Sequence, residues 1–394
     1  MIVAGGGVIY SEATSALRRL VLRTGIPVGE TQAGKGSMPF DHSGALGGLG
    51  ATGTLAANRM AAEADVVIGV GTRYTDFTTG SKTAFQASNV RFINVNVAGF
   101  DAHKHAGLAL VGDARAALEA IDVGLEGWSV EAPYRQQCAH LQAEWDQEVN
   151  RLYHLGHGPL AAQSEVLGAV NDLSGPRDVV VCAAGSMPGD LHKLWRTRDS
   201  KGYHVEYGYS TMGYEIAGGL GVKMADPDRE VYVMVGDGSF LMMAQELVTS
   251  IQERLKLTVV LVDNQGYASI GALSRSKGTA GFGTRYAYRT DGSLGDDSGQ
   301  HDGDPLPVDL ALNAQGLGVH VIRAHTVEEL RDALIAARAI DRTVVIHIPA
   351  DRYESIPSYG TWWEVPVSEV SDAAGVEQAR REHEQALTRR RWYL

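Results

Sequence analysis

Short apolar runs alternate with longer segments of helical spacing along this 394-residue sequence. The runs are too brief for helices and are typical of strands buried in a parallel sheet. They cover residues 2–4, 66–70, 90–95, 179–182, 231–235, 257–262 and 344–348. Helices are predicted between them, for example over 11–22, 54–63 and 241–255. This alternation predicts an α/β fold with two doubly wound parallel-sheet domains.

The same pattern predicts how the chain divides into domains. We expect a first domain over residues 1–125 and a second over 157–352, joined by a polar linker over 126–156. A tail over 353–394 follows, and it includes a charged helix predicted over 371–391.

Polar residues follow two of the predicted strands of the second domain. The strand over 231–235 runs into Gly236, Asp237 and Gly238, and Ser239 is expected to cap the next helix. The strand over 257–262 ends in Asp263 and Asn264. A strand, crossover helix and parallel strand place both ends at one edge of the sheet, where doubly wound folds bind ligands. Carboxylate and amide oxygens suit Mg²⁺ in the company of a ligand's phosphates.

A polar loop over 278–307 interrupts the second domain. Its length is typical of a lid, a binding loop or a disordered segment, and we favour a lid. Arg285, Tyr286, Tyr288 and Arg289 are candidate contacts to a polar substrate, with solvated surface as the alternative for each.

Composition narrows the class of protein. The formal net charge of −12 argues against nucleic-acid binding, because phosphate backbones attract a basic face. The sequence has no run of 18 apolar residues, so a membrane span is not expected. Its N-terminus lacks a basic segment before the apolar stretch, so a signal peptide is not expected either. Cys138 and Cys182 lie far apart, which argues against a disulfide scaffold or a zinc site. We therefore expect a cytoplasmic enzyme that acts on small molecules.

Two glycine-rich segments of the first domain resemble nucleotide-binding motifs incompletely. In the first, Gly5–Gly7 follow a predicted strand, but Tyr10 occupies the position of the third fingerprint glycine. In the second, GETQAGKG over 29–36, Gly36 stands where a phosphate loop needs a hydroxyl. Tight packing between strand and helix accounts for the glycines at the start of the chain, and nucleotide binding remains the alternative there.

The motif GDG, with Asn264 lying 27 residues after Asp237, resembles the signature of thiamine-diphosphate enzymes. One position departs from it, because Asp263 replaces the first asparagine of the usual pair. The resemblance implies thiamine diphosphate and Mg²⁺ as cofactors. It also implies that Asp237, Asn264 and the backbone carbonyl of Gly266 are the metal ligands.

Further stretches extend the resemblance to most of the chain. GETQAGKGSMP and GGLGATGT resemble the central domain of that family, and HVEYGYSTMGYEIAGGLGVKMA resembles the stretch that touches the cofactor rings. Met212 would be the catalytic residue, as the wedge that holds the cofactor bent, although an ordinary core methionine is the alternative. The implied cofactor-binding residues are Ala184, Gly185, Ser186, Met187, Tyr209, Ser210, Met212, Gly236, Gly238, Ser239, Tyr267 and Ala268.

Stretches unrelated to metal binding, such as GFGTRYAYR and LPVDLALNAQGLG, resemble one branch of the family, the hydrolases of inositol catabolism. This implies cleavage of a carbon–carbon bond in a cyclic 1,2-diketone to give 5-deoxy-glucuronate. Two alternatives stay open: a non-catalytic cofactor-binding module that regulates a complete relative, and a carboligase similar to acetolactate synthase.

The resemblance begins, at Met1, with the central domain. In the family a preceding pyrimidine-binding domain supplies a glutamate to the cofactor's aminopyrimidine ring. We therefore expect that glutamate to come from another chain, in a homo-oligomer or a hetero-complex. A split enzyme, a start site placed too late and a decayed protein are the three explanations.

Overall fold

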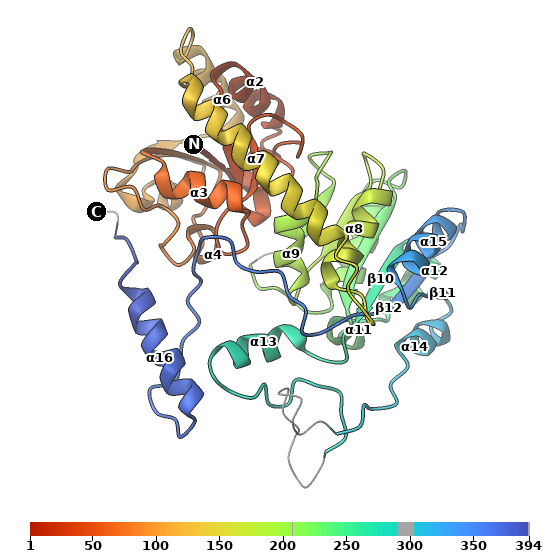
Figure 1. Ribbon diagram of the computed structural model, residues 1–394. Helices are drawn as coiled ribbons and strands as arrows, with labels where there is room; N and C mark the ends of the chain where they lie inside the picture. Colours follow the sequence, from red (N-terminus) through yellow and green to blue (C-terminus); the bar gives the residue numbers. More distant parts are fainter. Residues whose placement is uncertain (207, 290–302, 393–394) are drawn as a thin grey trace.

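The computed structural model describes residues 1–206, 208–289 and 303–392, and its two parallel sheets have six strands each (Figure 1). The first sheet has the order β3-β2-β1-β4-β5-β6. Its strands are β1 (Ile2–Ala4), β2 (Val28–Glu30), β3 (Ala45–Gly48), β4 (Val66–Val70), β5 (Arg91–Asn96) and β6 (Leu108–Val111). The helices around it are α1 (Gly6–Tyr10), α2 (Thr14–Thr24), α3 (Leu55–Glu63), α4 (Asp76–Thr79), α5 (Gly99–Ala102) and α6 (Ala114–Gly124), with 3₁₀ turns at Gln32–Gly34 and Lys104–Ala106.

The second sheet has the order β11-β12-β10-β9-β7-β8. Its strands are β7 (Val179–Cys182), β8 (Tyr203–Val205), β9 (Val231–Gly236), β10 (Thr258–Asp263), β11 (His320–Arg323) and β12 (Val344–Pro349). Its helices are α8 (Gln163–Leu173), α9 (Met187–Leu194), α10 (Tyr214–Ala225), α11 (Asp237–Met242), α12 (Glu246–Gln252), α13 (Ala268–Ser276), α14 (Leu310–Gly316) and α15 (Val327–Arg338). The predicted fold of two doubly wound α/β units is confirmed, and the proposed domain boundaries stay predictions.

Two predictions about the segment after β9 are wrong. The helix predicted over 241–255 is two helices, α11 and α12, because Met243 leaves the helical conformation where its side chain packs on Gly213. As a result Val248 and Ile251 are exposed rather than buried. Ser239 does not cap a helix either, since it lies inside α11, whose N-cap is Gly236.

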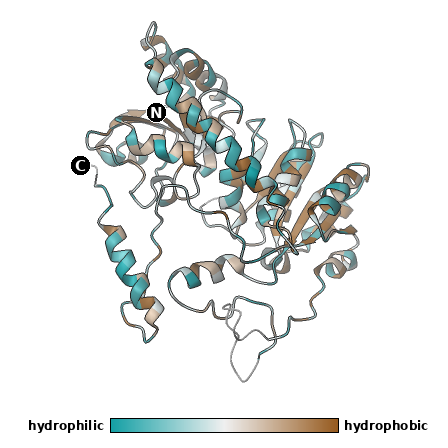
Figure 2. Ribbon diagram, in the orientation of Figure 1, coloured by the Kyte–Doolittle hydropathy of each residue, from teal (hydrophilic) through white to brown (hydrophobic). Residues whose placement is uncertain are grey.

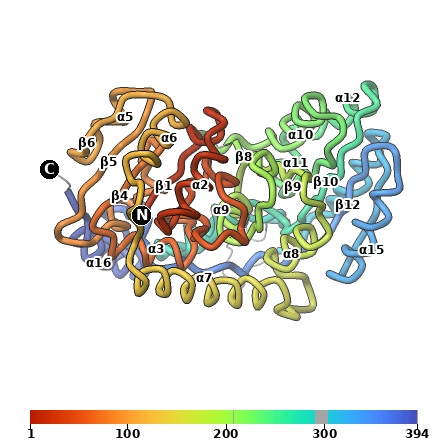
Figure 3. The backbone as a smooth tube through the Cα atoms, turned by 90° about the horizontal axis from the view of Figure 1, so that it is seen from above, coloured from red at the N-terminus to blue at the C-terminus, as the bar shows by residue number. Residues whose placement is uncertain are grey.

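Helix α7 (Ala132–Tyr153) runs along both sheets (Figure 3). Cys138, Leu141, Trp145 and Val149 on its inner face belong to a core that also contains residues of both sheets. The hydropathy colours of Figure 2 show apolar strands inside and a polar outer surface on α7 and on the C-terminal helix α16 (Ala374–Leu387). Among the residues that the structure describes, no helix is long and apolar enough to cross a membrane.

The GETQAGKG segment joins the two halves of the molecule. Lys35 is 3% exposed, and its ammonium donates to the carbonyl oxygen of His192 in α9 at 3.0 Å. The side chain of His192 lies between Glu30 and Thr52, with Nε2 3.1 Å from the Glu30 carbonyl oxygen and Nδ1 2.9 Å from the Thr52 hydroxyl. Lys35 is thus engaged in protein contacts, which argues against a phosphate loop at this segment.

Burial of His192 predicts acid sensitivity. Burial lowers the pKa of His192 to about 3, and Lys35 adds to the effect. The unfolded chain therefore binds a proton below about pH 6.5 that the folded chain does not bind, and the free energy of unfolding falls by up to about 1.4 kcal/mol per pH unit on acidification.

Urea unfolding of the wild type and of His192→Gln between pH 7 and pH 4 measures this contribution. The wild type should lose stability more steeply than the variant, whose side chain does not titrate. Equal slopes in the two proteins would contradict a neutral, buried His192.

Candidate functional site

The two predicted metal-binding side chains lie at the ends of neighbouring strands. β9 and β10 pair in parallel, and the pairing places Gly236 opposite Val262. Asp237 begins α11 directly after β9, and Asn264 follows β10. The predicted adjacency is confirmed, because both polar groups leave the same edge of the sheet.

Asp237 ties the two strand ends together. Its side chain is 2% exposed, Oδ1 accepts a hydrogen bond from Gly238 N at 2.7 Å, and Oδ2 accepts one from Gly266 N at 2.8 Å. Gly266 has φ +141°, and a Cβ there would lie 2.3 Å from the Thr284 carbonyl oxygen. Only glycine fits this turn, so the backbone after Asn264 is held against the Asp237 carboxylate.

The amide oxygen of Asn264 is buried and has no hydrogen-bond partner among the described residues. An unpaired buried oxygen costs about 1–3 kcal/mol, which a bound cation would offset. In the described parts of the chain, no cluster of three or more His, Cys, Asp or Glu side chains could hold a metal. The donor set at this edge therefore fits an ion that accepts carboxylate, amide and backbone oxygens, which is the preference of Mg²⁺.

The charges around Asp237 also favour a cation. Burial raises the pKa of Asp237 to about 7, the bond from Gly266 opposes the rise, and the nearby Asp263 carboxylate adds to it. Burial opposes ionisation of Asp263 as well, yet the hydrogen bond from His347 Nε2, at 2.9 Å, holds the pKa of Asp263 below its usual value. Asp263, the departure from the usual asparagine, thus brings a second negative charge to the site, although His347 partners it.

Three of the predicted cofactor-binding segments converge beside Gly238. A Cβ at Gly238 would lie 2.9 Å from the Tyr267 ring and 3.3 Å from Met212 Cε. Tyr267 immediately precedes α13, which begins at Ala268. The glycine thus leaves room for Met212 and Tyr267 above the start of α11.

A fourth segment, the loop after β7, leads into α9. Gly185 has φ +88° and is exposed, and Ser186 is the N-cap of α9. The N-terminus of a helix favours an anion, since its first N–H groups lack partners within the helix. Met187, unlike Gly185 and Ser186, is buried and belongs to the core.

Two of the predicted cofactor-binding residues are exposed at the surface. The side chain of Tyr209 is 94% exposed, and Ser210, which has φ +50°, is also exposed. In the predicted lid, the ring of Tyr286 packs against that of Tyr267, with centroids 5.7 Å apart, and burial raises the pKa of Tyr286. Residues 290–302 of that loop are outside the described residues.

Glu215 is a site residue that sequence reasoning missed. It lies in the first turn of α10, three residues after Met212, and is 1% exposed. Its carboxylate accepts hydrogen bonds from Ala184 N at 3.2 Å and from Gly213 N at 3.0 Å. Glu215 therefore joins the loop after β7 to the turn that carries Met212. An acidic residue within an otherwise small and apolar helix was the available signal.

Arg352 is a second residue that was missed. Its guanidinium donates to the carbonyl oxygens of Asn264, Gln265 and Thr284, at 3.2, 2.9 and 3.1 Å. It thereby fixes the turn after β10 against the start of the predicted lid. No local pattern indicated this role, because the contact joins segments far apart in the chain.

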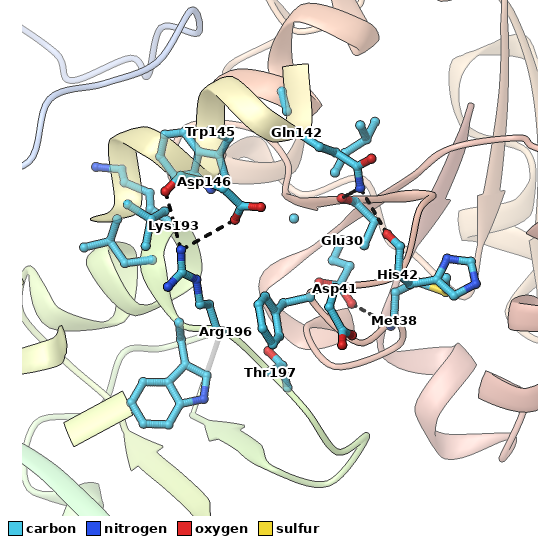
Figure 4. A pocket seen from close by; sticks show the side chains of 18 of the residues that line it. Glu30, Met38, Asp41, His42, Gln142, Trp145, Asp146, Lys193, Arg196 and Thr197 are labelled. Carbon is cyan, nitrogen blue, oxygen red and sulfur yellow. Dashed lines mark hydrogen bonds and ion pairs between the residues drawn. The ribbon is translucent and has the colours of Figure 1, made fainter. Parts of the chain in front are cut away.

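A cavity of about 270 Å³ lies elsewhere, between the first sheet, α7 and the end of α9 (Figure 4). Several of its polar side chains are already paired: Arg196 with Asp146 at 3.6 Å, and Gln142 with the Ala45 carbonyl oxygen at 2.6 Å. None of the predicted cofactor-binding residues lines it. The cavity is therefore distinct from the candidate site.

Two family models match this chain. Residues 1–121 match the central domain of thiamine pyrophosphate enzymes, and residues 183–348 match their C-terminal TPP binding domain. The second match begins directly after β7 and runs into β12, so it includes the edge that carries Asp237 and Asn264. The chain belongs to the thiamine pyrophosphate enzymes.

Particular relatives are hydrolases by name. The chain is 40% identical to 3D-(3,5/4)-trihydroxycyclohexane-1,2-dione hydrolase 1 of Bacillus cereus, over 96% of this chain and 62% of the relative. It is 39% identical to hydrolase 2 of the same organism, over 100% of this chain and 64% of the relative. It is also 39% identical to the 3D-(3,5/4)-trihydroxycyclohexane-1,2-dione hydrolase of Bacillus thuringiensis (strain Al Hakam), over 96% of this chain and 62% of the relative. The chain thus spans less than two thirds of the length of these curated relatives.

Replacing Glu215 tests its role as the joint between Ala184 and Gly213. In Glu215→Gln the side-chain NH₂ group faces a backbone N–H, and one buried donor loses its acceptor. The free energy of unfolding should fall by about 1–3 kcal/mol in urea titrations. The matched change at the exposed Glu126 should alter it by less than about 0.5 kcal/mol, and equal effects would contradict the assignment.

Proposed function

We propose that this chain binds thiamine diphosphate with Mg²⁺ and serves the hydrolysis of 3D-(3,5/4)-trihydroxycyclohexane-1,2-dione to 5-deoxy-glucuronate, a carbon–carbon bond cleavage of myo-inositol catabolism. The similarity to hydrolases of that name over at least 96% of the chain supports the substrate. The observation that carries the metal is the buried, unpartnered Asn264 amide oxygen at the strand end next to Asp237.

The chain's own groups divide the work of holding the cofactor. Asp237, Asn264 and the Gly266 carbonyl would hold Mg²⁺, an ion that commonly shares such oxygen ligands with phosphate groups. The loop of Ala184, Gly185 and Ser186 would bind the diphosphate, with the first N–H groups of α9 behind it. The diphosphate would also be bound at the start of α11, by the backbone of Gly236 and Gly238 and by the hydroxyl of Ser239.

The rings of the cofactor would lie against the remaining predicted residues. Met212 would support the cofactor in its bent form, beside Tyr267 and Ala268, while Tyr209 and Ser210 would close over it. When bound, thiamine diphosphate supplies a carbon that accepts the electrons of the broken bond. The chain's residues would orient this group.

A partner chain would complete the site. Large apolar side chains are exposed around it, which is typical of a surface that another protein covers: Leu241 (46%), Met242 (48%), Met243 (36%), Ile270 (57%), Phe282 (67%) and Tyr209 (94%). We propose that a pyrimidine-binding domain packs here and contributes the glutamate that acts on the aminopyrimidine ring. The assembly would be a homo-oligomer or a hetero-complex.

Consumption of the trihydroxy dione tests this function. It is measured with Mg²⁺ and thiamine diphosphate, first with this chain alone and then with a separately produced pyrimidine-binding domain of a relative. Hydrolysis in either reaction supports the proposal, and hydrolysis only in the mixture assigns the glutamate to the partner. Cofactor binding without hydrolysis in both reactions would indicate a non-catalytic cofactor-binding module. Carboligation of pyruvate would indicate a carboligase in place of a hydrolase.

Asp237→Ala should weaken Mg²⁺-dependent binding of thiamine diphosphate by about 100-fold or more, because it removes the charged metal ligand. Equilibrium dialysis of the cofactor at saturating Mg²⁺ measures the effect. Asp178→Ala is the matched control, since Asp178 also accepts a hydrogen bond from a glycine N–H but lies before β7, at the opposite edge of the sheet. Unchanged binding in Asp237→Ala would refute the metal assignment.

Met212→Ala should separate binding from turnover. The diphosphate contacts remain, so cofactor affinity should change by less than about threefold, while the turnover rate of the complemented complex should fall at least about tenfold. Met224→Ala, at a half-exposed position of α10, serves as the control. Normal turnover in Met212→Ala would contradict the wedge role.

A further inference from the structure

We propose that the central domain sets the cofactor affinity of this chain, with Gln32 and Lys35 as positioning residues that hold α9 and, through it, the diphosphate loop of Ala184, Gly185 and Ser186. The inference rests on the proposed function, because it takes that loop as the diphosphate site. It gives a role to the GETQAGKG segment, which lies far from Asp237 in the sequence and whose lysine binds the His192 carbonyl oxygen.

Gln32 holds the beginning of α9. Its side chain is 5% exposed, and Nε2 donates to the carbonyl oxygen of Pro188, the second residue of the helix, at 2.8 Å. The other end of the amide is also occupied, since the Tyr203 hydroxyl donates to Gln32 Oε1 at 3.0 Å. The orientation of the amide is therefore fixed from both sides, and Pro188 is held at a defined distance from the first sheet.

Lys35 holds the end of the same helix. The His192 carbonyl belongs to the last turn of α9, where carbonyl oxygens lack partners within the helix. The Lys35 ammonium, 3.0 Å away, provides one, and its positive charge opposes the partial negative charge of the helix C-terminus. The Glu30 carboxylate accompanies this buried cation, and itself accepts hydrogen bonds from Gly36 N and Met38 N at 3.0 and 2.9 Å.

The His192 side chain completes the contact. The neutral ring carries its proton on Nε2, because the Glu30 carbonyl 3.1 Å away can only accept, and Nδ1 then accepts from the Thr52 hydroxyl. A Cβ at Gly48 would lie 2.8 Å from His192 Nε2, so the first sheet approaches α9 without intervening side chains. Helix α9 is thus fixed to the first sheet at its first turn, its last turn and one face.

The diphosphate loop shares this fixed position. Ser186 is the N-cap of α9, and only Met187 separates it from Pro188. A shift of the first turn therefore moves the N–H groups that would meet the diphosphate. Displacements of about 1 Å at such a site are sufficient to reduce function markedly.

The test compares two buried amides that each donate to a backbone carbonyl oxygen and accept from a tyrosine hydroxyl. Asn94, in β5 of the same domain, donates to the Lys104 carbonyl oxygen at 2.8 Å and accepts from the Tyr74 hydroxyl at 2.9 Å, as Gln32 does with Pro188 and Tyr203. Gln32→Met and Asn94→Leu each replace the amide by an apolar group of similar size. Both should lower the melting temperature, but only Gln32→Met should raise the dissociation constant for thiamine diphosphate, by about tenfold or more at saturating Mg²⁺.

The outcomes of this experiment separate the two proposals. A wild type that does not bind thiamine diphosphate would overturn the proposed function. A wild type that binds, together with a Gln32→Met protein of equal affinity, would overturn the positioning role alone. Equal loss of affinity in Asn94→Leu would also contradict it, because general destabilisation would then explain the effect.

Hydrogen exchange of the wild type provides a test that requires no variant. Coupling between two sites is reciprocal, so a cofactor that stabilises the loop must also stabilise the contacts that position it. Addition of thiamine diphosphate and Mg²⁺ should slow amide exchange at least about threefold over residues 30–38 as well as over 183–192. Slower exchange in the second segment alone would contradict the inference.

Discussion

The parallel pairing of β9 with β10 is the constraint on which the candidate site depends. It brings Asp237, which follows β9, beside Asn264, which follows β10. The Asp237 carboxylate then accepts a hydrogen bond from Gly266 N and so holds the turn after Asn264. Arg352 and the close approach to Thr284 fix the same turn from the other side. Any change of register between the two strands would separate the carboxylate from the amide and leave neither as part of a site.

Several polar groups behind this edge are satisfied by the protein, while others among the described residues, such as His347 Nδ1, are buried without a partner. Glu215 accepts from Ala184 and Gly213, and His347 partners Asp263, whereas the Asn264 amide oxygen has no partner in the described structure. Buried polar groups are rarely left unpaired in a folded protein. The unpaired Asn264 oxygen is therefore a hydrogen-bonding reason, beside the sequence resemblance, to propose a bound cation here.

Sequence patterns predicted the elements whose signal is local. The apolar runs that became β4 and β7 needed only neighbouring residues, and the turn residues after β9 and β10 identified the edge where Asp237 and Asn264 meet. The break at Met243 was not predictable, because it arises from packing against Gly213 in another segment.

The supporting contacts were hidden from sequence reasoning for the same physical reason. Gln32 reaches Pro188 and Arg352 reaches Thr284 only after the chain has folded. The glycines of GETQAGKG suggested a phosphate loop, since the motif describes a flexible backbone but not the partner of its lysine. That partner is the His192 carbonyl, and it turns an apparent ligand-binding motif into a contact between the two sheets.

We propose that one metal ion and the cofactor diphosphate share the site at the ends of β9 and β10. Mn²⁺ can replace Mg²⁺ at oxygen-rich sites and is paramagnetic, so electron–nuclear double resonance detects phosphorus bound next to it. A shared site predicts a strong ³¹P coupling when thiamine diphosphate is added to the Mn²⁺-loaded wild type, and its loss in Asn264→Ala. Mn²⁺ binding with no ³¹P coupling, or a coupling that persists unchanged in Asn264→Ala, would contradict it.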